Sequence, residues 1–329
     1  MDYGPCDELP SSYKILVAGG FGGGEDAHAT TELFDPAAGR FLPAARMGSA
    51  RQSHTATRLQ DGRVLIAGGF TTDSLSSAEL YDPLADRFEP TGSLTTARSG
   101  HTAVPLKDGR VLIVGGEGRG TTFLASAEVY DPRTGTFTPT GSMMVPRSSH
   151  TANLLPDGRV LVCGGHQGRQ AGIQIYASAE LYDPTTGRFR PTGSMTRIRH
   201  KHDASSLADG QVLIVGGTDA RDDQGAYSSA EVYQSARETF APVGEMSWPR
   251  YKHQGTSVLL LTGQVFVAGG AVQAERYDPV TAAFERIPGD FGDRPLFAAA
   301  ALLLDGRVLV SGGYGEHSYA RANAWLYTP

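Results

Sequence analysis

Arginine and histidine recur together at a fixed spacing along this chain. The motif Arg-x-x-His recurs five times at intervals of 47 to 52 residues, and a sixth copy has phenylalanine in place of histidine. The copies are Arg51/His54, Arg98/His101, Arg147/His150, Arg199/His202, Arg250/His253 and Arg294/Phe297. Guanidinium groups bind carboxylates and phosphates, whereas histidines transfer protons or ligate metals. The motif is therefore compatible with three kinds of site: an anion-binding site, a catalytic site and a metal site.

A second repeat identifies the elements that must position these residues. A short apolar segment ending in Gly-Gly recurs seven times, at intervals of 43 to 53 residues. The first glycines of these segments are Gly19, Gly68, Gly115, Gly164, Gly216, Gly269 and Gly312. Each segment is rich in Val, Ile and Leu and stops at glycine, which predicts a buried strand rather than a helix.

The rest of each unit predicts three further strands. A strand such as Glu79–Pro83 follows the Gly-Gly segment, and after its Asp-Pro turn comes a short strand carrying an aromatic residue such as Phe88. The Arg-x-x-His loop then leads into an alternating strand that turns at Asp-Gly into the next Gly-Gly segment. Each unit is therefore expected to be a four-stranded antiparallel meander.

Seven such units predict an all-β, seven-bladed β-propeller of four-stranded antiparallel blades, formed by residues 1–329 as a single domain. The Gly-Gly pair, the Tyr-Asp-Pro turn and the aromatic of the last strand resemble the Kelch family, which implies a Kelch-type propeller. Closure of the ring is open at this point. Either N-terminal residues, with Pro5–Pro10 at an inner-strand position, complete the ring, or one blade has fewer than four strands.

Composition excludes several partners. The formal net charge is −6 and no basic tract is interleaved with aromatic residues, so nucleic acid is not expected. Neither a membrane span nor a signal peptide is apparent, so we expect no membrane partner and, by default, the cytoplasm. Two cysteines, Cys6 and Cys163, leave the redox compartment open. We expect a monomer.

When the repeats are aligned, a residue type that recurs at the same position in every unit is expected to stabilise the scaffold. A residue that differs from its equivalents in the other units is expected to serve function. One histidine per blade at the same position would be spread around a ring, so we expect scaffold histidines and no metal site. His28 and His317 have acidic neighbours but no ligand spacing. For the arginines, one interpretation is structural pairing with the glutamate that heads the third strand of six units. Those glutamates are Glu32, Glu79, Glu128, Glu180, Glu231 and Glu275.

The Kelch resemblance implies a different role for the arginines. In Kelch-type ubiquitin-ligase adaptors a Pro-Arg-Ser-Gly segment presents its arginine to an acidic peptide, and Ala97–Gly100 and Val145–Ser148 are similar to it. The resemblance implicates Arg98 and Arg147 as ligand-binding residues. It extends more weakly to Arg51, Arg199, Arg250 and Arg294.

Long loops are expected on one face of the propeller. The loops after Gly-Gly and the arginine loops should share this face, here called the mouth face, while the Asp-Gly turns lie opposite. The long loops are Phe21–Thr31, Glu117–Ser126, His166–Ser178, Thr218–Ser229 and Tyr314–Asn323. His200-Lys201 and Tyr251-Lys252 replace small polar residues there and, with Arg197, Arg199 and Arg250, form a basic cluster. This cluster predicts an anionic ligand, although a solvated charged rim is the simpler alternative.

Two functions remain open. The first is binding of a small anionic molecule or an acidic peptide at the mouth face, with Lys201 and Lys252 joining the six arginines. The second is a cofactor-independent isomerase, lyase or cyclase acting on a small anionic substrate. Its acid and base would come from His166, His200, Tyr251, Glu117 and Tyr314. A deep pocket lined by His166, His200 and Tyr314 would favour the enzyme, and a wide face would favour the binder.

No cofactor is expected for either function. Some Kelch relatives are copper radical oxidases whose additional C-terminal domain carries a ligand. Because this chain ends with the propeller, that activity is not expected.

Overall fold

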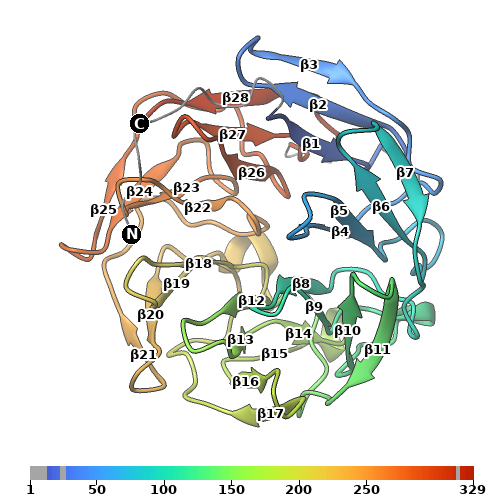
Figure 1. The fold of residues 1–329 in the computed structure, drawn as a ribbon. Helices are drawn as coiled ribbons and strands as arrows, with labels where there is room; N and C mark the ends of the chain where they lie inside the picture. Colours follow the sequence, from blue (N-terminus) through green and yellow to red (C-terminus); the bar gives the residue numbers. More distant parts are fainter. Residues whose placement is uncertain (1–12, 23–26, 316–318) are drawn as a thin grey trace, which may run out of the picture.

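The computed structural model describes residues 13–22, 27–315 and 319–329. Seven of its antiparallel sheets, each of three or four strands, are arranged as a ring around a central axis (Figure 1). We call them blades 1 to 7 in chain order. The all-β, seven-bladed propeller expected from the repeats is therefore confirmed.

Within each blade, the strands follow one another in chain order from the central axis to the outer edge. Blades 1 and 2 contain β1 (Ile15–Ala18), β2 (Thr31–Asp35) and β3 (Arg40–Pro43), then β4 (Thr55–Arg58), β5 (Val64–Ala67), β6 (Ala78–Asp82) and β7 (Arg87–Pro90). Blades 3 and 4 contain β8 (Thr102–Pro105), β9 (Val111–Val114), β10 (Ala127–Asp131) and β11 (Thr136–Thr140), then β12 (Thr151–Leu154), β13 (Val160–Cys163), β16 (Ala179–Asp183) and β17 (Arg188–Pro191).

The remaining strands complete the ring. Blades 5 and 6 contain β18 (Asp203–Ser206), β19 (Val212–Val215), β20 (Ala230–Gln234) and β21 (Thr239–Pro242), then β22 (Ser257–Leu259), β23 (Val265–Val267), β24 (Glu275–Asp278) and β25 (Ala283–Arg286). Blade 7 contains β26 (Ala299–Leu302), β27 (Val308–Ser311) and β28 (Ala324–Tyr327). Mouth-face loops add a hairpin of β14 (His166–Gln167) and β15 (Gln174–Ile175) and three 3₁₀ turns, η1 (Arg119–Thr121), η2 (Gln170–Gly172) and η3 (Asp222–Gly225).

The Gly-Gly pair marks a place where two loops approach too closely for a side chain. Gly68 and Gly69 have φ angles of 61° and 105°. A Cβ atom on Gly68 would lie 2.5 Å from the backbone oxygen of Arg98, and one on Gly69 would lie 2.8 Å from that of Gln52. Glycine is therefore required both for its conformation and for its size.

Blades are held together by apolar side chains between neighbouring sheets. Between blades 2 and 3, Leu65 and Leu80 belong to the same cluster as Val111 and Ile113. Each of these side chains is buried, and close-packed apolar burial is the dominant stabilising contribution in a protein core. The ring is thus stabilised by repeated contacts between neighbouring sheets, and these contacts position the mouth-face loops.

The ring is closed by contacts between the first and last blades. Phe34 of blade 1 packs with Leu303 and Leu309 of blade 7, and Arg307 donates a hydrogen bond to the Pro36 backbone oxygen at 2.8 Å. Blades 1 and 7 have three strands each in the described residues, so these are the incomplete blades that the sequence left open. The proposed role of Pro5–Pro10 and the position of Cys6 lie outside the described residues. Within those residues, no helix is long and apolar enough to cross a membrane.

Candidate functional site

The two variable columns of the sequence are paired directly on the mouth face. In blades 2 to 5 the residue after the loop arginine forms an antiparallel bridge with the residue after Gly-Gly of the same blade. These bridges are Gln52–Phe70, Ser99–Glu117, Ser148–His166 and His200–Thr218. In blade 7 the bridge joins Leu296 and Tyr314. The expectation that both sets of loops share one face is confirmed.

Five of the six loop arginines are fully buried, which corrects their expected role as ligand-binding residues. Each guanidinium forms an ion pair with the glutamate that heads the third strand of the same blade. The Nη2–Oε distances are 2.7 Å for Arg51–Glu79, 2.9 Å for Arg98–Glu128, 3.1 Å for Arg147–Glu180, 2.7 Å for Arg199–Glu231 and 2.9 Å for Arg250–Glu275. No ligand at the channel mouth reaches these groups, and the alternative interpretation of structural pairing holds for these five.

The buried ion pairs are completed by backbone hydrogen bonds. In blade 3, Arg98 Nη1 donates to the Gly115 oxygen at 2.8 Å, and Glu128 Oε2 accepts the Thr95 N–H at 2.7 Å. Burial lowers the pKa of Arg98, and the charge of Glu128 opposes this shift. Because the charged groups have several partners each, the cost of removing them from water is offset, and losing one partner would leave the other charge buried and unpaired.

The recurring histidines connect neighbouring blades. The Nε2 atoms of His101, His150 and His202 lie 3.1, 3.0 and 3.0 Å from the hydroxyl oxygens of Thr55, Thr102 and Thr151 of the preceding blade. Burial lowers the pKa of His54 to about 4, that of His150 to about 3 and that of His101 well below its usual value. These imidazoles are therefore neutral parts of the scaffold.

Blade 5 departs from this pattern at Asp203, a residue that the sequence interpretation missed. Asp203 stands where the three preceding motif copies have threonine after histidine, and its carboxylate accepts the N–H groups of Gly255, Thr256 and Ser257 at 2.9, 2.9 and 2.6 Å. Burial nevertheless raises its pKa. The break in the His-Thr column was the available signal.

A second missed feature is a ring of residues with left-handed backbone around the channel mouth. Ser53, Gly100, Ser149, Lys201, Lys252 and Phe297 occupy the third position of successive motif copies or its blade 7 equivalent, with φ between 51° and 57°. The N–H of Gly100 donates to the Ser53 oxygen at 2.9 Å, and that of Lys252 to the Lys201 oxygen at 3.0 Å. This backbone geometry, which is uncommon for residues other than glycine, recurs at one variable position in each of blades 2 to 7.

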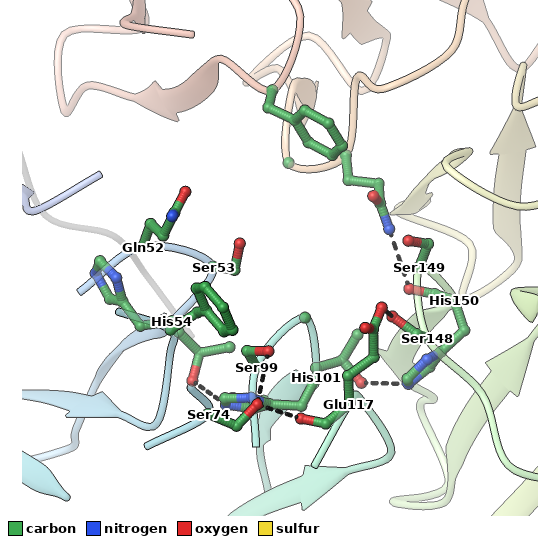
Figure 2. Close-up of a pocket in the computed structure, with 18 of the residues that line it drawn as sticks. Gln52, Ser53, His54, Ser74, Ser99, His101, Glu117, Ser148, Ser149 and His150 are labelled. Carbon is green, nitrogen blue, oxygen red and sulfur yellow. Dashed lines mark hydrogen bonds between the residues drawn. The ribbon is translucent and has the colours of Figure 1, made fainter. Parts of the chain in front are cut away.

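The opening leads into a cavity of about 1030 Å³. Most of its lining comes from blades 2 to 4 and is small or polar, and Figure 2 shows these side chains around the hollow. We call the mouth residues of these three blades the open half: Gln52, Ser53, Ser99, Gly100, Ser148 and Ser149. The hydroxyl and amide side chains of this lining offer hydrogen-bond donors and acceptors to a ligand.

The five acid–base candidates do not meet in this cavity. Glu117 lines it, whereas His166, His200, Tyr251 and Tyr314 are absent from its described lining. His166 and His200 do contact each other, with their Nδ1 atoms 3.1 Å apart. Burial lowers the pKa of His166 to about 4 and that of His200 to about 3. Burial raises the pKa of Tyr251 to about 12 and also raises that of Tyr314.

The expected basic cluster is neutralised by the loop that follows Gly-Gly in blade 5. Lys201 Nζ lies 2.7 Å and Lys252 Nζ lies 3.9 Å from carboxylate oxygens of Asp222, and Arg294 Nη1 lies 2.8 Å from Asp223. We call these five residues, with their loop, the filled half of the mouth. Sequence interpretation missed the two aspartates as partners because they lie about twenty residues or more from the cations.

Aromatic rings surround one of these ammonium groups. Lys252 Nζ lies 5.2, 6.0 and 5.6 Å from the ring centroids of Tyr251, Phe297 and Tyr314. Arg197, which was expected to join the cluster, lies over the ring of Tyr227 at 5.5 Å. Cation–π contacts of this length hold the cations in place.

No group of three metal-ligating side chains comes together in the described part of the chain. The acidic neighbours of the two sequence candidates, Glu25 and Asp26 for His28 and Glu316 for His317, lie outside the described residues, as does His317 itself. Cys163 is a buried free thiol, and burial raises its pKa to about 11.

The fold and the mouth define a repeat-built propeller with a variable central pocket. Residues 53–270, about two thirds of the chain, match the model of the KLHDC2/KLHL20/DRC7 Kelch-repeats domain. The chain therefore belongs to this family of Kelch-repeat propellers. Propellers of this family are typically protein-interaction scaffolds.

Two human proteins support the family assignment, although each alignment covers only part of this chain and part of the relative. Kelch-like protein 34 of Homo sapiens is 33% identical over 122 residues, which are 34% of this chain and 18% of that protein. Kelch-like protein 33 of Homo sapiens is 27% identical over 152 residues, which are 44% of this chain and 26% of that protein. The matches thus span at most about a quarter of either relative.

A solved structure matches across nearly the whole chain. A fungal alcohol oxidase of the AA5 family, determined in complex with copper, superposes with a TM-score of 0.75 over 97% of this chain and 72% of its own. The sequences are 17% identical. At that level the likeness shows the propeller fold alone.

Proposed function

We propose that this Kelch propeller is a protein-interaction module that takes a segment of a partner protein into the cavity at the mouth of its channel. The observation that carries the proposal is the open cavity of about 1030 Å³ that is lined by hydroxyl and amide side chains from several blades. Peptide segments carry hydrogen-bonding backbone groups at every residue, which such a lining can satisfy.

The anionic ligand expected from the sequence is less well supported. Lys201 and Lys252 do not belong to the described lining of the cavity, and both face Asp222. An anion would first have to displace this internal carboxylate. The enzyme is also less well supported, because Glu117 is the one acid–base candidate among the described lining residues.

A photo-crosslinking experiment tests the proposed site. A photo-reactive amino acid at Ala103, inside the cavity, should crosslink a partner segment that can be sequenced and made as a peptide. That peptide should bind the wild-type protein and lose at least tenfold in affinity when Gln52 and Gln254, which line the cavity from blades 2 and 6, are both changed to Trp.

Leu84→Trp provides the matched control. Leu84 is 95% exposed on an outer turn, so the same bulky side chain there should leave binding unchanged. The absence of any crosslinked partner at Ala103, or equal binding by the blocked and control variants, would remove the site.

A further inference from the structure

The charges that line the central cavity indicate the chemistry of the partner segment, an inference that rests on the function proposed above. Two of its acidic residues already accept backbone N–H groups: Asp203 accepts three, and Asp73 accepts that of Ser74 at 2.7 Å. Glu117 is the third. Arg169 is the one arginine or lysine in the described lining, so the cavity itself carries an excess of negative charge.

Histidines do not reverse this balance. His54, His101 and His150 line the cavity, and the pKa of each is lowered by burial, the first to about 4 and the last to about 3. All three are therefore uncharged near neutral pH. Among the described lining residues, the one cation that an anionic ligand could meet is therefore Arg169, which already contacts Glu117.

Glu117 is held in a fixed orientation at the wall of the cavity. Its backbone N–H and C=O both pair with Ser99, at 2.8 and 2.9 Å, and its Oε1 atom accepts the hydroxyl of Ser148 at 3.1 Å. Figure 2 shows the Glu117 and Ser148 side chains turned toward each other beside the hollow. The Glu117 side chain remains 20% exposed, and its second oxygen, Oε2, is not used by Ser148.

That second oxygen is occupied by the chain's own Arg169. The guanidinium of Arg169 contacts Glu117 Oε2 and is itself 61% exposed. Arg169 lies at the tip of the β14–β15 hairpin, between Gly168 and Gln170, which have φ angles of 73° and 49°. An exposed ion pair from a loop tip contributes little stability, so it can exchange with another cation.

We propose that Glu117 receives an arginine or lysine side chain of the partner segment, and that Arg169 occupies this position when no partner is bound. A guanidinium approaching Glu117 finds a pre-oriented carboxylate. The hydroxyl of Ser99, whose backbone pairs with that of Glu117, adds an acceptor within the same lining.

A pair of small probes that differ only in charge tests the proposal. N-acetyl-arginine amide and its uncharged analogue N-acetyl-citrulline amide are titrated against the wild-type protein while NMR spectra are recorded. The arginine probe should bind about tenfold more tightly, because one charge-assisted hydrogen bond corresponds to roughly that factor. Equal affinity of the two probes would overturn the proposal.

Three variants locate the effect. Glu117→Gln should bring the arginine probe to the affinity of the citrulline probe, and Arg169→Ala should raise its affinity severalfold by removing the competing cation. Glu238→Gln is the control, because Glu238 pairs with Arg159 and Arg190 away from the cavity lining, and should change nothing. An unchanged affinity in Glu117→Gln, with an unchanged unfolding temperature, would refute the role of Glu117.

Failure here is distinguishable from failure of the proposed function. If crosslinks place the partner in the cavity but its peptide binds Glu117→Gln and wild type equally, the charge preference is wrong and the binding site stands. If the crosslinker at Ala103 captures no partner, the binding site is wrong as well.

Discussion

The open half and the filled half of the mouth are built on the same scaffold but present different chemistry. In both halves a buried arginine–glutamate pair supports the loop, as in Arg98–Glu128 and Arg199–Glu231. In the open half the following residues are small and polar and leave a cavity. In the filled half they include Lys201 and Lys252, which are covered by Asp222.

This comparison separates two uses of charge. A charge that recurs in successive blades is buried and neutralised within its own blade, where it positions a loop. A charge that occurs in one blade meets whatever the neighbouring loop supplies. Whether such a charge is available to a ligand therefore depends on the inserted loop and not on the strand that carries the charge.

The largest expected effect tests the shared scaffold. Arg98→Ala in the open half and Arg199→Ala in the filled half should each lower the free energy of unfolding by about 3–5 kcal/mol, because each leaves a buried glutamate unpaired. Urea denaturation measures both losses. Arg190→Ala, which removes an arginine that is 50% exposed, should cost less than about 1 kcal/mol.

Unequal results would break the comparison. If Arg98→Ala cost no more than Arg190→Ala, its guanidinium would not act as a scaffold group in the open half. The two halves would then differ in their support and not only in their loops.

A pH dependence tests the boundary between the halves, where His166 and His200 meet. The folded protein lowers both pKa values below the ordinary value of 6.5, so the unfolded chain binds more protons and stability is lost as the pH falls from about 6.5 toward 4. Changing both histidines to Gln should reduce the loss between pH 7.5 and pH 5 by about 2 kcal/mol or more.

Denaturation curves across this pH range provide the measurement. A double variant with the same pH dependence as the wild type would contradict burial of these two imidazoles as neutral groups. Above pH 7.5 the two proteins should have the same pH dependence in either case.

The smallest expected effect asks whether the filled half hides an anion site. Asp222→Asn together with Asp223→Asn removes the internal counter-charges, so the capped dipeptide acetyl-Asp-Glu-amide should bind about tenfold more tightly than to the wild type. Calorimetry measures the change. The further substitutions Lys201→Met and Lys252→Met should abolish the gain, and a gain that survives them would show that these lysines do not form the site.

Much of the fold was predictable because blades repeat the same local pattern. Gly-Gly, Tyr-Asp-Pro and Asp-Gly each mark a strand end, and seven spaced copies predict seven blades. The arginine–glutamate pairing was one of two interpretations, since both residues recur with the blade. Asp203 was missed although it breaks the His-Thr column, because its acceptor role depends on three N–H groups of the next blade.

The recurrence in the sequence determined the number of blades, the order of strands and which residues recur at equivalent positions, because these properties come from local turns and strand patterns. Tertiary structure decided which charges a ligand can reach. Lys201 and Asp222 are 21 residues apart, and Glu117 and Arg169 are 52 residues apart, yet each pair is in contact. Such contacts depend on how inserted loops fold back over their own blade or a neighbouring one, and no repeating pattern encodes that path.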